Sequence, residues 1–88
     1  MKDADSPLQF PCRFPIKAMG RPENEFRDTI IEIISRHTES LSEEHISEQS
    51  SSADNFLSVT VTINATSREQ LDRIYEDLTE CQQVLMAL

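Results

Sequence analysis

Apolar and polar residues alternate along residues 10–19, as they do in a strand with one buried face. The side chains of Phe14, Ile16 and Ala18 fall on one face of this segment, and those of Arg13 and Lys17 fall on the other. A period of two residues is typical of a half-buried strand. The pattern therefore predicts a first strand here, which ends at the only glycine of the chain.

Residues 55–65 alternate more regularly and are rich in β-branched side chains. A high density of β-branched residues, with one apolar and one polar face, favours a central strand of an antiparallel sheet. The apolar face consists of Leu57, Val59, Val61 and Ile63, and the polar face includes Ser58, Thr60, Thr62 and Asn64.

Two segments instead repeat their apolar residues at helical spacing. The first predicted helix runs from about residue 24 to residue 37. The second begins at a capping box, in which the Ser67 hydroxyl can bond the backbone amide of Gln70 and the Gln70 side chain can reach back toward the cap. The apolar stripes are Phe26, Ile30, Ile33, Ile34, His37 and Leu41 in the first helix, and Leu71, Ile74, Tyr75, Leu78 and Cys81 in the second.

The remaining segments give weaker patterns. Residues 39–54 are rich in serine and glutamate, and they predict a short edge strand near residues 45–48 followed by a loop through residues 50–54. Residues 84–88 are apolar and predict a last strand. Residues 1–8 are polar, so we expect a flexible segment there and a single domain over residues 9–88.

The predicted order is strand, helix, strand, strand, helix, strand. Right-handed crossovers then give an α+β fold of the ferredoxin-like type, with a four-stranded antiparallel sheet and both helices on one face. The first and third strands should be central. The other sheet face should stay uncovered, and we expect Leu85 and Ala87 of the last strand to point to that side.

The acidic net charge of the chain argues against some classes of binding partner. Eight basic residues stand against sixteen acidic ones, and the formal net charge is -8. Proteins that bind nucleic acid or anionic membranes need clustered lysine and arginine, so neither partner is expected. The chain has no run of 18 apolar residues and no signal-like leader, and its two cysteines are isolated in sequence. These features predict a cytoplasmic protein with reduced thiols.

No residue pattern indicates catalysis, a metal or a cofactor. His37 and His45 are eight positions apart, which matches no standard ligand spacing. Cys12 and Cys81 each fit a small apolar residue better than a reactive thiol. We therefore expect a protein that is not an enzyme.

The candidate site is the uncovered sheet face. Arg13 and Lys17 should lie there beside the hydroxyls of Thr60 and Thr62. This face is either an ordinary solvated surface or a surface for a protein partner, a second copy or a small anion. Two further candidates follow the first strand. Gly20 is either a plain turn residue or a point where a ligand approaches the backbone, and Arg21 comes directly after it.

The chain also resembles the YbeD-like family of small bacterial proteins, from about residue 8 to residue 88. The run Thr62-Ile63-Asn64-Ala65-Thr66 is its most specific segment. In the loop before this strand, where the family often has Lys-Gly, the chain has Ala53-Asp54. The other shared residues are Phe10, Pro11, Phe14, Lys17, Met19, Gly20, Arg36, His37, Ser58, Val59, Glu69, Gln70, Tyr75, Glu76, Leu78, Val84, Met86 and Leu88.

The resemblance implies a ferredoxin-like fold similar to ACT regulatory domains, and no established active site. The family is often labelled as lipoic-acid-binding and regulatory. Two hypotheses follow. In the first, the protein is a regulatory or adaptor domain that acts through protein contacts on its open sheet face, either with another protein or as a homodimer. In the second, it senses a small anion such as lipoate or an amino acid, and ACT-like binding would then use the turn at residues 19–21.

Overall fold

The computed structural model describes residues 9–23, 25–39, 41–51 and 55–88. The predicted flexible segment 1–8 and part of the predicted loop 50–54 lie outside these ranges. In chain order the elements are β1 (Cys12–Gly20), α1 (Phe26–Ser35), the 3-10 turn η1 (Glu43–His45), β2 (Ile46–Ser50), β3 (Leu57–Ala65), α2 (Arg68–Glu80) and β4 (Val84–Ala87).

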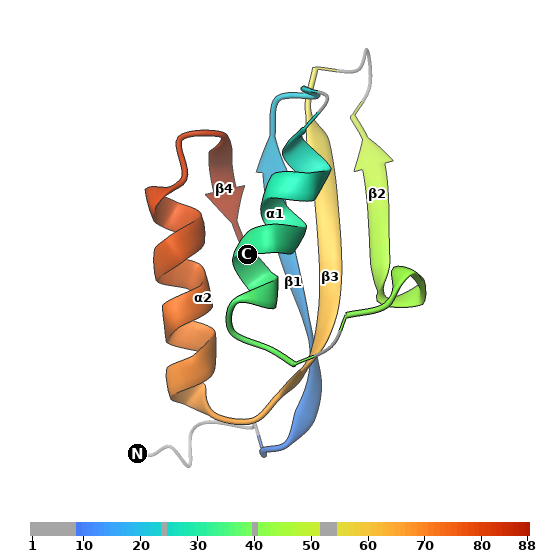
Figure 1. The fold of residues 1–88 in the computed structure, drawn as a ribbon. Helices are drawn as coiled ribbons and strands as arrows, with labels where there is room; N and C mark the ends of the chain where they lie inside the picture. Colours follow the sequence, from blue (N-terminus) through green and yellow to red (C-terminus); the bar gives the residue numbers. More distant parts are fainter. Residues whose placement is uncertain (1–8, 24, 40, 52–54) are drawn as a thin grey trace.

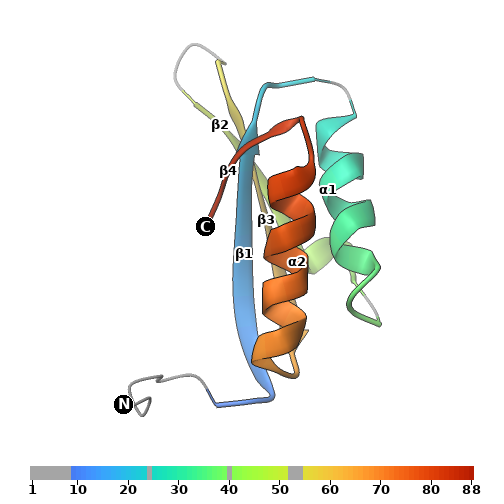
Figure 2. The ribbon, with the colours of Figure 1, turned by 90° about the vertical axis from the view of Figure 1, so that its left-hand side faces the viewer.

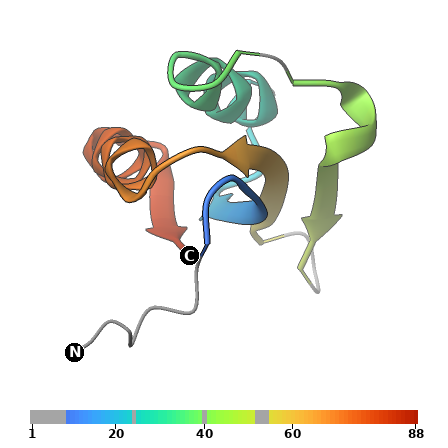
Figure 3. The ribbon, with the colours of Figure 1, turned by 90° about the horizontal axis from the view of Figure 1, so that it is seen from below.

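The four strands form one antiparallel sheet in the order β2-β3-β1-β4 (Figure 1). The first and third strands are therefore central, as the sequence predicts. Both helices cover the same face of the sheet, and no helix of the described residues lies on the opposite face (Figure 2). Figure 3, seen from below, shows the two helices side by side on that one face. The predicted α+β fold of the ferredoxin-like type is confirmed.

The core lies between the helices and the sheet, and it uses the apolar faces that the sequence patterns predict. Thirteen apolar residues of the described chain are buried there. No polar or charged residue of the described chain is buried. The thirteen apolar residues are Ile16, Ala18, Phe26, Ile30, Ile33, Ile34, Val59, Val61, Ile63, Ala65, Leu71, Ile74 and Leu78.

The N-terminus of α2 is capped, with one difference from the predicted box. The Ser67 hydroxyl accepts a hydrogen bond from the Gln70 amide (3.1 Å). The Gln70 side-chain oxygen accepts from the amide of Thr66 (2.7 Å), one residue before the cap. Its side-chain nitrogen donates to the carbonyl of His37 (2.7 Å). Gln70 thus ties the start of α2 to the end of α1, which local spacing could not indicate.

The expected orientation of β4 is wrong for Ala87. The register shifts between Met19 and Gly20, so that Ala87 pairs with the buried Ala18 and Met86 pairs with Met19. Because paired residues share a sheet face, Ala87 packs against the core and Met86 lies on the uncovered face. The prediction assumed regular alternation along the last strand, and it therefore assigned Ala87 to the wrong face of the sheet.

Gly20 is a point of close packing and not a turn with unusual backbone angles. It is buried at the end of β1, and its φ is not positive. A Cβ atom there would overlap the carbonyl oxygen of Gln83 and lie 2.5 Å from Cε1 of Phe26. Close approach is thus the reason for glycine, but the groups that approach belong to this chain.

An ion-pair network holds the edge strand β2 to α1. The guanidinium of Arg27 lies 2.6 Å from a carboxylate oxygen of Glu43 and 2.6 Å from one of Glu48. β2 begins at Ile46, one residue after the predicted start, and only Ile46 of this strand packs against the core. This network supplies the contacts that the polar sequence of β2 lacks.

Candidate partner-binding face

The uncovered face of the sheet is organised in rows that cross all four strands. In one row, Lys17 pairs with Thr60 on β3, and Thr60 pairs with Ser47 on β2. On its other side Lys17 exchanges backbone hydrogen bonds with Leu88, at 3.1 Å and 2.8 Å. This row therefore begins with the hydroxyls of Ser47 and Thr60, continues with the ammonium group of Lys17, and ends with the apolar side chain of Leu88.

A second row repeats the same change of character. Gln49, Ser58, Met19 and Met86 pair in that order across the sheet. The β2 end of the face is thus polar and the β4 end is apolar. Met86 and Leu88 are 51% and 61% exposed, so the apolar end is open to a partner.

Arg13 lies further along β1, opposite Asn64. Its Nη1 atom is 3.2 Å from Nε2 of His45, and Nδ1 of His45 is 3.1 Å from the Ser42 hydroxyl. Since guanidinium only donates, Nε2 of His45 is the acceptor in this contact. Sequence reasoning did not find this link because the two residues are 32 positions apart.

The structure brings together four of the six residues that the sequence suggested. Arg13, Lys17, Thr60 and Thr62 share the uncovered face, where Thr62 pairs with Pro15. Gly20 lies on the buried side beyond one end of this group. Arg21 is exposed just past the strand, so it belongs to the end of the sheet and not to the rows.

No carboxylate of the described residues forms an ion pair with the cations near the uncovered face. Among the described residues, neither Lys17 nor Arg21 has an ion pair, and Arg13 contacts an imidazole instead of an acid. In a chain of net charge -8, Arg13 and Lys17 make the uncovered face of β1 a region with two positive side chains. Such a region attracts anionic groups of a partner.

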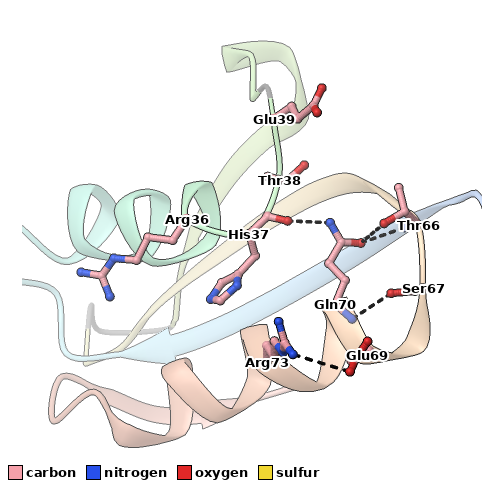
Figure 4. A pocket seen from close by; sticks show the side chains of 9 residues that line it. All are labelled: Arg36, His37, Thr38, Glu39, Thr66, Ser67, Glu69, Gln70 and Arg73. Carbon is pink, nitrogen blue, oxygen red and sulfur yellow. Dashed lines mark hydrogen bonds and ion pairs between the residues drawn. The ribbon is translucent and has the colours of Figure 1, made fainter.

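A separate hollow of about 430 Å³ lies where the end of α1 meets the start of α2 (Figure 4). Two cations line it, but each lies near an acid on its own helix: Arg36 is 3.5 Å from Glu32, and Arg73 is 3.5 Å from Glu69. The hollow therefore carries no excess positive charge, and it is a weaker candidate than the open face.

Beside this hollow, Nε2 of His37 lies 2.6 Å from Oδ2 of Asp77. The pair is partly buried and joins the segment just after α1 to α2. Within the described ranges, no group of three or more histidine, cysteine or acidic residues is arranged to hold a metal ion. The thiols of Cys12 and Cys81 are not in a disulfide. In the same part of the chain, no helix is both long and apolar enough to cross a bilayer.

The fold is similar to a solved structure, the solution structure of protein HP0495 from H. pylori. The TM-score is 0.77 at 15% sequence identity, and the match covers 98% of this chain and 91% of the other. At this identity the likeness concerns the fold alone.

Sequence relatives lie in several bacteria. A UPF0250 protein of Chromobacterium violaceum is 46% identical over 92% of this chain and 91% of its own length. A UPF0250 protein of Neisseria meningitidis is 34% identical over 99% of this chain and 96% of its own length. Residues 5–88 match the family model described as "Protein of unknown function (DUF493)". The chain therefore belongs to this family of small bacterial proteins, in agreement with the YbeD-like resemblance of its sequence.

Proposed function

We propose that this protein is a regulatory or adaptor domain of the cytoplasm that acts by binding another protein on its open sheet face. It performs no chemistry of its own. The proposal is supported above all by the two cross-strand rows, which change from polar side chains on β2 to the exposed Met86 and Leu88 at the β4 side. Protein interfaces commonly combine apolar and polar side chains.

The positive charges on this face indicate what kind of partner it would bind. Arg13 and Lys17 are the cations of the two central strands on that side. A partner with acidic groups at matching positions would gain both affinity and association rate from them. The acidic remainder of the chain would repel the same partner elsewhere, so the contact is confined to this face.

The test is capture of partners from a native host lysate with the wild-type chain and with the double variant Arg13→Glu, Lys17→Glu. We expect a reproducible partner with the wild type and none with the variant, while circular dichroism of the two is the same. Thr66→Ala, at an exposed residue beyond the rows, is the matched control and should retain the partner. Equal capture by the charge-reversed variant would refute the proposal, as would the absence of any reproducible partner for the wild type.

A second candidate function is the sensing of a small anion such as lipoate or an amino acid. It is supported by the absence of ion pairs at Lys17 and Arg21 among the described residues. The burial of Gly20 beneath Phe26 and Gln83 argues against backbone binding at that glycine, so an anion would bind to the side chains alone.

Thermal unfolding with lipoate, octanoate and amino acids tests this second function. A ligand at 100 times its Kd stabilises the folded state by about 2.7 kcal/mol. For a domain of this size that corresponds to a rise in Tm of roughly 10 °C or more. The rise should vanish in Lys17→Ala or Arg21→Ala. No rise with any of these anions near millimolar concentration would exclude this function for them.

A further inference from the structure

The outer edge of β4 is available for strand pairing. β4 is the last strand of the sheet order, and within the described ranges no strand lies beyond it. The reciprocal hydrogen bonds between Lys17 and Leu88 direct the backbone of Leu88 toward β1. Because inward and outward groups alternate in an antiparallel ladder, the N–H and C=O of Ala87 point away from the sheet.

The side chains of this edge are apolar and exposed. Leu85, Met86 and Leu88 are 53%, 51% and 61% exposed, and they are three of the four large apolar residues that the described surface exposes. Sheets usually protect such an edge with charged side chains or proline. The segment from Val84 to Leu88 contains neither, so this edge is suited to an added strand.

An acidic surface of α2 borders the same edge. Asp72, Glu76 and Glu80 are spaced by four residues, so they lie along one side of the helix. With Tyr75 and Thr79 they line a hollow that contains no basic residue. None of the three carboxylates has an ion pair with a described residue.

Tyr75 shows that this side of α2 adjoins β4. Its hydroxyl donates a hydrogen bond of 2.7 Å to the carbonyl oxygen of Leu88. In Figure 1, α2 lies over the β4 side of the sheet. A strand added beside β4 would therefore have the acidic surface of α2 next to one of its faces.

We propose that the outer edge of β4 binds an extended segment of a partner protein in which apolar residues alternate with lysine or arginine. Alternate side chains of a strand point to opposite faces. One set would pack beside Met86 and Leu88 on the open face, and the other set would approach Asp72 and Glu76. The inference rests on the proposed function only in that the ligand is a protein.

A second copy of this chain fits the edge less well. Symmetric pairing of two β4 strands places both pairs of helices on one face of a joined sheet. The acidic surfaces of the two α2 helices would then face each other, in two chains that each carry a net charge of -8. Like charges across an interface oppose association, which favours a basic segment as the occupant.

The test is an NMR titration of the ¹⁵N-labelled full chain with a peptide of about eight residues that alternates valine and lysine. We expect shifts at the amides of residues 84–88 and 72–80, and little change in β2 at the other edge. Two control peptides are matched in length: one with glutamate in place of lysine, and one with the same composition in two blocks. Equal binding of the glutamate peptide, or shifts confined to β2, would overturn the proposal.

Two variants locate the binding. Ala87→Pro removes the outward N–H and should abolish the shifts, because proline at a strand edge cannot donate to an added strand. Asp72→Asn with Glu76→Gln keeps the edge and removes two charges, so the peptide Kd should rise roughly two- to thirtyfold. If Ala87→Pro does not fold, the variant Asp72→Asn, Glu76→Gln still tests the proposal, since an unchanged peptide Kd would contradict it.

The open-face variant Arg13→Glu, Lys17→Glu separates the two proposals. It should bind the alternating peptide at least as tightly as the wild type, because it adds negative charge and leaves the edge of β4 unchanged. If it loses the native partner while the peptide fails to bind the wild type, the proposed function stands and the β4 proposal is wrong. If the peptide binds at β4 and no native partner depends on Arg13 and Lys17, the reverse holds. If the wild-type chain instead dimerises through β4 and does not bind the peptide, the proposal of a basic segment at this edge is also wrong.

Discussion

At the residue scale, the roles of two residues depend on groups that are distant in the sequence. Gly20 is glycine because the Gln83 carbonyl and the Phe26 ring occupy the space of a side chain. His37 is an apolar-stripe position by spacing, yet its ring pairs with Asp77 at 2.6 Å. In both cases the determining group lies on another element, so its effect arises only when the chain folds.

Gly20→Ala should destabilise the protein by about 1–3 kcal/mol, since the added methyl group forces the ring or the backbone to move. The free energy of unfolding in urea measures this. Ser47→Ala, at an exposed position of β2, is the control and should change stability by about 0.5 kcal/mol or less. Equal stability of Gly20→Ala and the wild type would show that the close approach at Gly20 is relaxed in solution.

At the element scale, the weakest strand depends on a contact from a helix. β2 is short and polar, and local propensity gives it little stability. Arg27 of α1 reaches Glu43 and Glu48, one before and one within this strand. The strand is therefore positioned by tertiary contact more than by its own sequence.

Arg27→Ala should lower stability by roughly 0.5–1.5 kcal/mol, because it removes two ion pairs and the packing of the side-chain stem. Hydrogen exchange of the amides in residues 46–50 should quicken more than that of β1. Arg36→Ala removes an exposed pair with Glu32 and serves as the matched control, with no selective effect on β2. Uniform quickening across the sheet would mean that Arg27 does not act on β2 in particular.

At the scale of the whole molecule, stability should depend on alkaline pH through Tyr75. Burial raises the pKa of this phenol above its ordinary value of 10.0. The folded state therefore keeps the proton that the unfolded state releases as the pH rises past about 10. Because the folded state then binds more protons, the free energy of unfolding falls with rising pH in this range.

Tyr75→Phe should reduce the alkaline loss of stability, since phenylalanine has no proton to release. Urea unfolding of both proteins at pH 8 and at pH 10.5 gives the comparison. The variant should also be less stable at pH 8, because it loses the hydrogen bond to Leu88. An identical alkaline decline in the two proteins would assign the decline to other groups.

The order of elements, the fold class and the core faces could be predicted from the sequence, because each depends on local periodicity. The alternation in residues 57–63 and the helical stripes at residues 26–34 and 71–78 correspond to buried positions, except that Leu57 and Tyr75 are only partly buried. The same alternation places Arg13, Lys17, Thr60 and Thr62 on the opposite face. Burial of one face of a strand or helix is encoded every two or every three to four residues, so the sequence alone determines it.

Tertiary structure decided what depends on partners far apart in the chain. The register shift opposite Gly20 turned Ala87 inward and exposed Met86, and no local pattern marks such a shift. The contacts of Arg13 with His45 and of Arg27 with Glu48 join separate elements, as does the proximity of the acidic side of α2 to β4. These arrangements arise from how helices and strands pack together, and packing is fixed only in the folded chain.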